Sequence, residues 1–190
     1  MQPIETERLR LRNFREHDAD ALFAYLKSPV ASCFLSLTLS DMEAARTDAA
    51  KRSKDEEQIA VCLKDTDLMI GDLFAHREED TVSVGWNFNP AYFGMGYALE
   101  AARALFVDLF DNAQARRIYA YVEDHNLPSQ RLCERLGMRQ EGLFLEYVSF
   151  KNDEAGKPIY ENTMQFAILR WEWEAARTQF FRPNQELVDA

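Results

Sequence analysis

The sequence contains few of the residues that hold metals and disulfides. Its 190 residues include only three cysteines and three histidines. Cys33, Cys62 and Cys133 lie far apart and form no Cys-x-x-Cys pair, so we predict neither a disulfide framework nor a structural zinc site. Because the histidines are equally scattered, we expect no metal site of any kind.

The chain also lacks a long apolar run. No stretch approaches the ~20 apolar residues that a membrane helix needs. The N-terminal segment Met1–Glu7 has neither the basic region nor the apolar region of a signal peptide. We therefore expect a cytoplasmic protein without a membrane partner.

Basic residues are outnumbered in this chain. It has 22 lysines and arginines against 32 aspartates and glutamates, a formal net charge of −10. Such a surface repels phosphate backbones, so general nucleic-acid binding is disfavoured, and cationic partners such as amines are favoured. A local array of backbone N–H groups can still bind one anion.

Length and composition predict one globular domain. A chain of 190 residues with 47% hydrophobic residues can bury a single core. It contains no repeat and no low-complexity linker. We assign residues 1–174 to this domain and leave residues 175–190 as a tail without a structural assignment.

Hydrophobic periodicity predicts both helices and strands. Alternating or continuous apolar residues predict strands at 9–11, 59–63, 68–74, 82–88, 118–122, 143–150 and 163–169. Helical spacing predicts helices at 18–27, 40–54, 98–110 and 128–137. Since short polar loops join the strands between residues 59 and 88, we expect an antiparallel meander there.

A glycine-containing turn lies between the strand at 82–88 and the most apolar helix. It reads Phe93-Gly94-Met95-Gly96-Tyr97-Ala98. Its glycines let the backbone approach a ligand, and the helix start supplies free N–H groups and a positive dipole end. An anion such as pyrophosphate fits this turn, and a tight turn without a ligand is the alternative. A Rossmann site is disfavoured because Leu99 stands where a third small residue is needed.

A second polar element follows the strand at 118–122. Asn126 and Ser129 lie where that strand ends and the next helix begins. Their side chains can either cap the helix or contact a ligand, and both interpretations stay open. Cys133 lies on the apolar face of this helix, so we interpret it as a small buried thiol rather than a nucleophile.

Together, the two elements resemble the GNAT superfamily of acyl-CoA-dependent N-acyltransferases. The family's pyrophosphate loop has Gln or Arg, two residues, Gly, one residue, and then Gly or Ala. Phe93, Gly96 and Ala98 take these places here.

The later family motif has Asn, two residues, Ser or Ala, and then a helix ending in Gly-Phe. Its places are taken by Asn126, Ser129, Gly137 and Met138. The segments Glu7–Arg12, Pro90–Ala102 and Arg170–Trp173 resemble the branch of ribosomal-protein N-terminal acetyltransferases (RimJ/RimL-like). The resemblance covers nearly the whole chain.

The resemblance implies a single-domain GNAT-like α/β (α+β) fold. Its mixed, mostly antiparallel twisted sheet would be splayed near the middle, with helices on both faces. Acetyl-CoA would bind in the splay as co-substrate, and an amine would attack its thioester directly in a ternary complex. The residues expected to bind it are Phe88, Phe93, Gly94, Met95, Gly96, Tyr97, Ala98, Asn126 and Arg131.

The chain departs from the family pattern at several positions. Phe93 replaces the usual Gln or Arg, and Met95 stands where Lys or Arg is common, which removes a positive contact to phosphate. Met138 replaces Phe at similar volume. Cys133 stands where many members carry the tyrosine that protonates the leaving thiolate. In the ribosomal-protein branch a serine at the position of Ser129 is thought to serve, so Ser129 is the expected donor.

Amide formation also needs a base, because an alkylamine is mostly protonated at neutral pH. Glu123 and Glu146 are the candidates on strand ends near the expected splay. We select Glu146 as the catalytic residue that acts with Ser129, since alternation places it beside Phe144 and Val148 in a partly buried position. An ordinary solvent-facing glutamate is the alternative.

The acceptor is expected to be a primary amine on a peptide or a small molecule. Candidates are a protein N-terminus, a polyamine-like cation and an aminoglycoside-like antibiotic. Trp86, Tyr92 and Phe88 either line the acceptor pocket or pack in the core. The alternative function is a non-catalytic acyl-CoA-binding or interaction module on the same fold, and a homodimer is left open.

Overall fold

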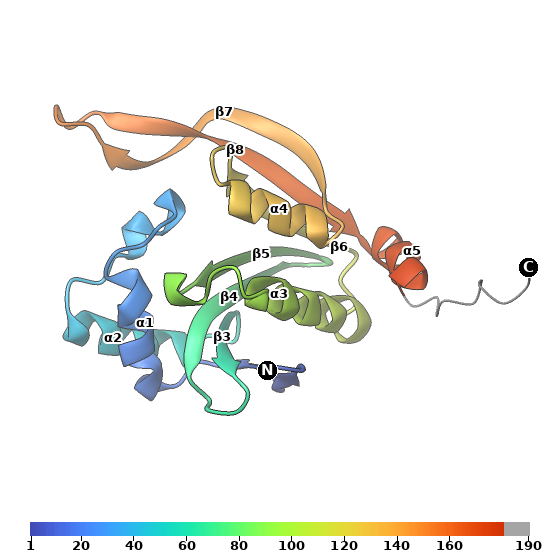
Figure 1. Cartoon of the computed structure of the whole chain (residues 1–190). Coiled ribbons are helices and arrows are strands. Elements are labelled where there is room, and N and C mark those ends of the chain that lie inside the picture. The colour runs from blue at the N-terminus through green and yellow to red at the C-terminus, as the bar shows by residue number, and fades with distance from the viewer. Residues whose placement is uncertain (181–190) are drawn as a thin grey trace, which may run out of the picture.

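One eight-stranded sheet organises the molecule. The computed structural model describes residues 1–180 (Figure 1). The strands are β1 (Ile4–Glu5), β2 (Leu9–Asn13), β3 (Gln58–Leu63), β4 (Met69–Glu78), β5 (Thr81–Phe88), β6 (Arg117–Glu123), β7 (Arg139–Asn152) and β8 (Pro158–Leu169). They lie in the order β1-β2-β3-β4-β5-β6-β8-β7, and every neighbouring pair is antiparallel except β5 and β6. The predicted strands and the antiparallel meander are confirmed.

In residues 1–180, four α-helices and four short helical turns lie between the strands, and a fifth α-helix follows β8. They are η1 (Glu16–Asp18), α1 (Ala19–Leu26), η2 (Ser32–Leu37), α2 (Met42–Arg52), η3 (Pro90–Tyr92), α3 (Tyr97–Val107), η4 (Asp108–Asn112), α4 (Leu127–Arg135) and α5 (Arg170–Phe180). The four predicted helices are confirmed. Helix α5 runs across the expected domain end at residue 174, and residues 181–190 of the expected tail lie outside the described part. In residues 1–180, no helix is both long and apolar enough to cross a membrane.

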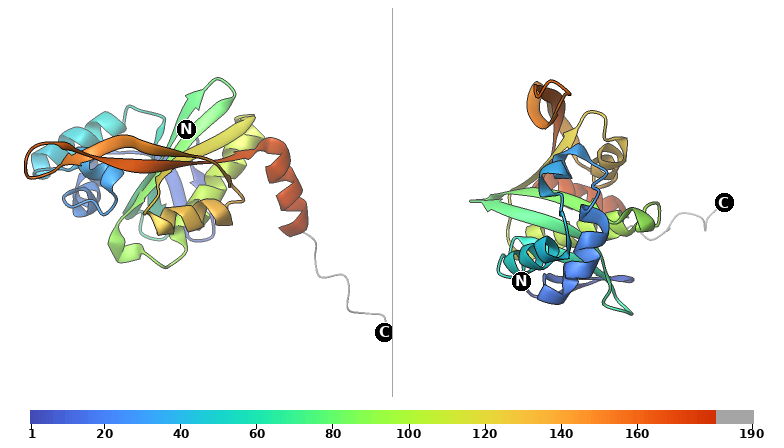
Figure 2. Two further views of the ribbon diagram at one scale, coloured as in Figure 1. Left: turned by 90° about the horizontal axis from the view of Figure 1, so that it is seen from above. Right: turned by 90° about the vertical axis from the view of Figure 1, so that its left-hand side faces the viewer.

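Helices cover both faces of the sheet, as expected. Successive residues of β3 alternate between two cores: Ile59 and Val61 belong to the core that contains α3, whereas Ala60 and Cys62 belong to the core that contains α1 and α2. Figure 2 shows α1 and α2 on one side of the green strands β4 and β5, with α3 and α4 on the other.

The sheet splays between β5 and β6. These strands pair only at Thr81–Arg117, Val82–Ile118 and Ser83–Tyr119. Beyond these pairs no ladder joins residues 84–88 to residues 120–123, so the two strands diverge. The parallel pairing therefore confirms the predicted splay and places its open end beside the glycine turn and the start of α4.

Candidate functional site

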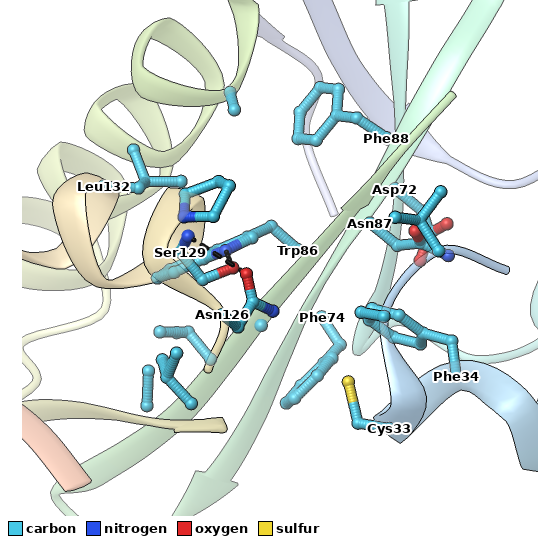
Figure 3. Close-up of a pocket in the computed structure, with 18 of the residues that line it drawn as sticks. Cys33, Phe34, Asp72, Phe74, Trp86, Asn87, Phe88, Asn126, Ser129 and Leu132 are labelled. Carbon is cyan, nitrogen blue, oxygen red and sulfur yellow. Dashed lines mark hydrogen bonds between the residues drawn. The ribbon is translucent and has the colours of Figure 1, made fainter. Parts of the chain in front are cut away.

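A large cleft occupies the splay. Its volume is ≈ 1140 Å³, and residues from β4, β5, β6, η2, α2, α4 and the glycine turn line it. All nine residues expected to bind the co-substrate line this one cleft, although they come from three separate chain segments. Figure 3 shows the part of it that lies between η2 and α4.

The glycine turn presents backbone donors at one end of the cleft. Gly94 and Gly96 have φ angles of +77° and +81°, a region that favours glycine. Gly96 is the N-cap of α3, and its carbonyl accepts the first helical bond, from the N–H of Glu100 at 3.1 Å. The preceding N–H groups, from Tyr97 to Leu99, therefore have no partner within the helix. They are donors of the kind that the predicted anion site requires.

Arg8, near the N-terminus, holds this turn in place. Its guanidinium forms an ion pair with Glu100 at 2.6 Å and donates to the carbonyl of Met95 at 3.0 Å. It also lies 4.6 Å from the ring centroid of Tyr97. Sequence reasoning missed this clamp, because more than 85 residues separate Arg8 from its partners.

Two arginines supply positive charge to the same cleft. Arg131 and Arg135 lie one turn apart on α4, and both are exposed and line the cleft. Neither forms an ion pair with another residue of the described chain. Arg131 was an expected ligand of the co-substrate, and its spacing of four residues from Arg135 was the signal that could have identified the second arginine.

Asn126 caps α4. Its Oδ1 accepts from the backbone N–H of Ser129 at 3.3 Å. The capping interpretation of Asn126 is therefore confirmed. Its Nδ2 group also donates to Glu123 Oε2 at 3.1 Å, so Asn126 links the cap to the end of β6.

The Ser129 side chain takes no part in that cap. Its Oγ instead accepts from Trp86 Nε1 at 3.1 Å, across the splay from β5 (Figure 3). The hydroxyl proton of Ser129 therefore remains available for a second partner in the cleft. Trp86, Tyr92 and Phe88 all line the cleft, and Phe88 is at the same time part of the core.

Glu123 is a buried carboxylate on the cleft wall. Only 5% of it is exposed, and Oε1 accepts from the backbone N–H of Cys33 at 3.0 Å. Burial raises the pKa of Glu123, but hydrogen bonds from Cys33 and Asn126 outweigh burial and hold that pKa below its ordinary value. The carboxylate is therefore charged at neutral pH.

Glu146 lies elsewhere. Its side chain is exposed and does not line the cleft, so the expected partial burial is wrong. The reason is a bulge in β7: Phe144 pairs with Thr163 and Val148 with Glu161, which leaves two extra residues on β7. Glu146 has a φ of +46° inside this bulge, so the alternation from Phe144 to Val148 does not fix the direction of its side chain.

Cys133 is fully buried in the main core. Burial raises the pKa of its thiol to about 12. A thiol that stays protonated is a poor nucleophile, which agrees with its interpretation as a packing residue.

Comparison with known proteins agrees with this geometry. Residues 8–139 match the family model described as "Acetyltransferase (GNAT) domain". An uncharacterized N-acetyltransferase, YnaD of Bacillus subtilis, is 33% identical over 173 residues, which are 90% of this chain and 98% of that protein. Another, p20 of Bacillus licheniformis, is 28% identical over 183 residues, 91% of this chain and 99% of that protein.

A solved structure also has the same fold. The acetyltransferase (GNAT family) from Bacillus anthracis superimposes with a TM-score of 0.80 at 30% identity, covering 90% of this chain and 99% of that one.

Proposed function

Because the chain belongs to the GNAT family of acetyltransferases, we propose that it transfers an acetyl group from acetyl-CoA to a primary amine by direct attack in a ternary complex. The observation that carries this proposal is the single cleft at the splay. It joins an array of free backbone N–H groups at one end to a buried, charged carboxylate at the other.

The glycine-turn end suits the co-substrate. Backbone N–H groups from Gly94 to Ala98 can hold its diphosphate, and Arg131 and Arg135 can offset the phosphate charge despite the acidic surface. Bound acetyl-CoA supplies the activated acetyl group. The nine residues predicted from sequence are proposed as its binding set, with Arg135 added.

Glu123, rather than Glu146, is proposed to receive the proton of the amine, directly or through water. Glu123 lines the cleft and is ionised at neutral pH, whereas Glu146 is exposed outside it. Ser129 is proposed to donate its hydroxyl proton to the leaving thiolate and to take a proton back from water, because Trp86 already occupies one of its acceptor positions. Membership of the branch of ribosomal-protein N-terminal acetyltransferases is likewise proposed.

The test compares binding and turnover. Acetyl-CoA at a hundred times its dissociation constant is expected to stabilise the protein by about 2.7 kcal/mol, and NADH is expected to have no effect. Release of the CoA thiol on addition of primary amines is the second expected result. Absence of both would refute the proposal, and binding without thiol release for any amine would instead favour a non-catalytic acyl-CoA-binding module.

A further inference from the structure

Glu123 has no paired counter-charge among residues 1–180. Its hydrogen-bond partners are the N–H and the thiol of Cys33 and the amide of Asn126, all neutral donors. No lysine, arginine or histidine in residues 1–180 forms an ion pair with it. A buried carboxylate is normally paired with a cation, because desolvating a lone charge is costly. The cleft beside Glu123 is therefore suited to a cation that comes from outside.

Two other carboxylates on this side of the cleft, Asp48 and Asp72, are already paired with an arginine. Arg52 forms ion pairs with Asp48 at 2.8 Å and with Asp72 at 3.3 Å. Asp72 also accepts a hydrogen bond from the hydroxyl of Tyr25. The remaining acid lining this wall, Asp55, accepts a hydrogen bond from the backbone N–H of Glu57 at 2.9 Å. A single buried carboxylate without a cation matches a ligand with one ammonium group better than a ligand with several.

Aromatic rings surround the same space. Phe34 from η2, Phe74 from β4 and Trp86 from β5 all line the cleft. Figure 3 shows Phe34 and Phe74 beside Cys33, across the cleft from Ser129 and Asn126. A Cβ atom on Gly85 would lie only 2.6 Å from Phe74 Cζ, so the absence of a side chain there lets the Phe74 ring lie against β5.

The entrance to the part of the cleft that contains these aromatic rings is apolar too. Val30 and Leu37 line the cleft and are 71% and 43% exposed. Exposed aliphatic groups at a cleft entrance favour an apolar guest over a strongly hydrated one.

We propose that the acceptor is a small primary amine with one positive charge and an aromatic body, an arylalkylamine. Glu123 would hold its ammonium group, and Phe34, Phe74 and Trp86 would enclose its ring. This inference rests on the proposed acetyltransferase function. The inferred acceptor class is narrower than the one predicted from the sequence. Polyamines and aminoglycosides carry several hydrated charges, which the aromatic part of the cleft does not match.

The first experiment compares amines that differ in one feature. We expect kcat/KM for 2-phenylethylamine to exceed that for n-propylamine by about 10- to 100-fold, the gain from burying a phenyl ring. Spermidine, an aminoglycoside and a peptide with N-terminal alanine are expected to be poorer substrates than 2-phenylethylamine. Equal or higher kcat/KM for any of these would overturn the inference while leaving the acetyltransferase function intact.

Variants test the assigned contacts. Phe34→Leu should lower kcat/KM for 2-phenylethylamine several-fold. Gly85→Ala should have the same effect, because the added methyl group displaces Phe74. In both variants, kcat/KM for n-propylamine and the KM for acetyl-CoA should stay near wild type. Trp171→Leu is the matched control, because Trp171 is 65% exposed outside the cleft. Equal losses for both amines in Phe34→Leu would overturn the aromatic subsite.

Direct binding separates this inference from catalysis. Calorimetry on protein saturated with CoA should show binding of 2-phenylethylamine, weakened about 10-fold or more in Glu123→Gln, where the charge is lost but the shape is kept. Absence of binding would overturn the inference whatever the turnover. Failure of acetyl-CoA itself to bind would instead refute the proposed function.

Discussion

Replacing Ser129 with alanine separates a chemical role from a structural one. The change removes Oγ and with it the 3.1 Å hydrogen bond from Trp86 Nε1. It leaves the cap of α4 in place, because Asn126 accepts from the backbone N–H of residue 129, which alanine also has. The variant should therefore lose the proposed proton donor without losing the start of the helix.

The magnitudes follow from these contacts. One neutral hydrogen bond at a half-open site is worth about 1 kcal/mol, and the better helix propensity of alanine offsets part of it. The free energy of unfolding should thus fall by less than about 1 kcal/mol. Loss of a positioned proton donor should lower kcat about 100-fold. Affinity for acetyl-CoA should stay near wild type.

The assay measures kcat from thiol release at saturating acetyl-CoA, with affinity from calorimetry and stability from urea denaturation. Asn126→Ala is the structural comparison, expected to lose about 1 kcal/mol of stability with the cap. Trp86→Phe removes the same hydrogen bond but keeps the hydroxyl, so its kcat should fall only about 5-fold. A Ser129→Ala enzyme with full kcat would refute the donor role.

Three further predictions concern stability, binding and pH. Asp18→Asn should lower the free energy of unfolding, measured by urea denaturation, by about 3 kcal/mol. Arg12 is 3% exposed and lies 2.8 Å from Asp18, so the change leaves it without its buried partner. A loss below about 1 kcal/mol would contradict this. Gly96→Ala should cost about 1 kcal/mol, since its φ of +81° strains alanine, and should weaken acetyl-CoA binding in calorimetry; unchanged affinity would argue against the anion site. The folded pKa of Glu123 lies below its ordinary value of 4.5, so its stabilising contribution is complete above pH 4.5 and is lost as pH falls through the folded pKa. The stability advantage of wild type over Glu123→Gln should therefore shrink in urea titrations below pH 4.5, and an advantage that grows there would contradict the lowered pKa.

The sequence predicts best what depends on neighbouring residues. Helices, strands and the glycine turn rest on periodicity and local backbone preference, and all three were found. Alternation failed at Glu146, because a bulge in β7 breaks the period of two and nothing in the apolar pattern of residues 143–150 marks the extra residues. Segment Ser32–Leu37 shows no clear period, so η2 was missed although it forms one wall of the cleft.

The two ends of the cleft also differ in whether they depend on neighbouring or on distant residues. This difference affects how the acidic charge of the chain is interpreted. The proposed co-substrate end is built from two local motifs, whereas Glu123 is held by Cys33, 90 residues away in sequence. The net charge of −10 suggests a general attraction for cations. In the cleft, however, Asp48 and Asp72 are paired with Arg52, so their charge is already balanced within the protein. In our proposal the buried carboxylate of Glu123, which salt screens less than exposed charges, selects the amine, rather than the surface charge.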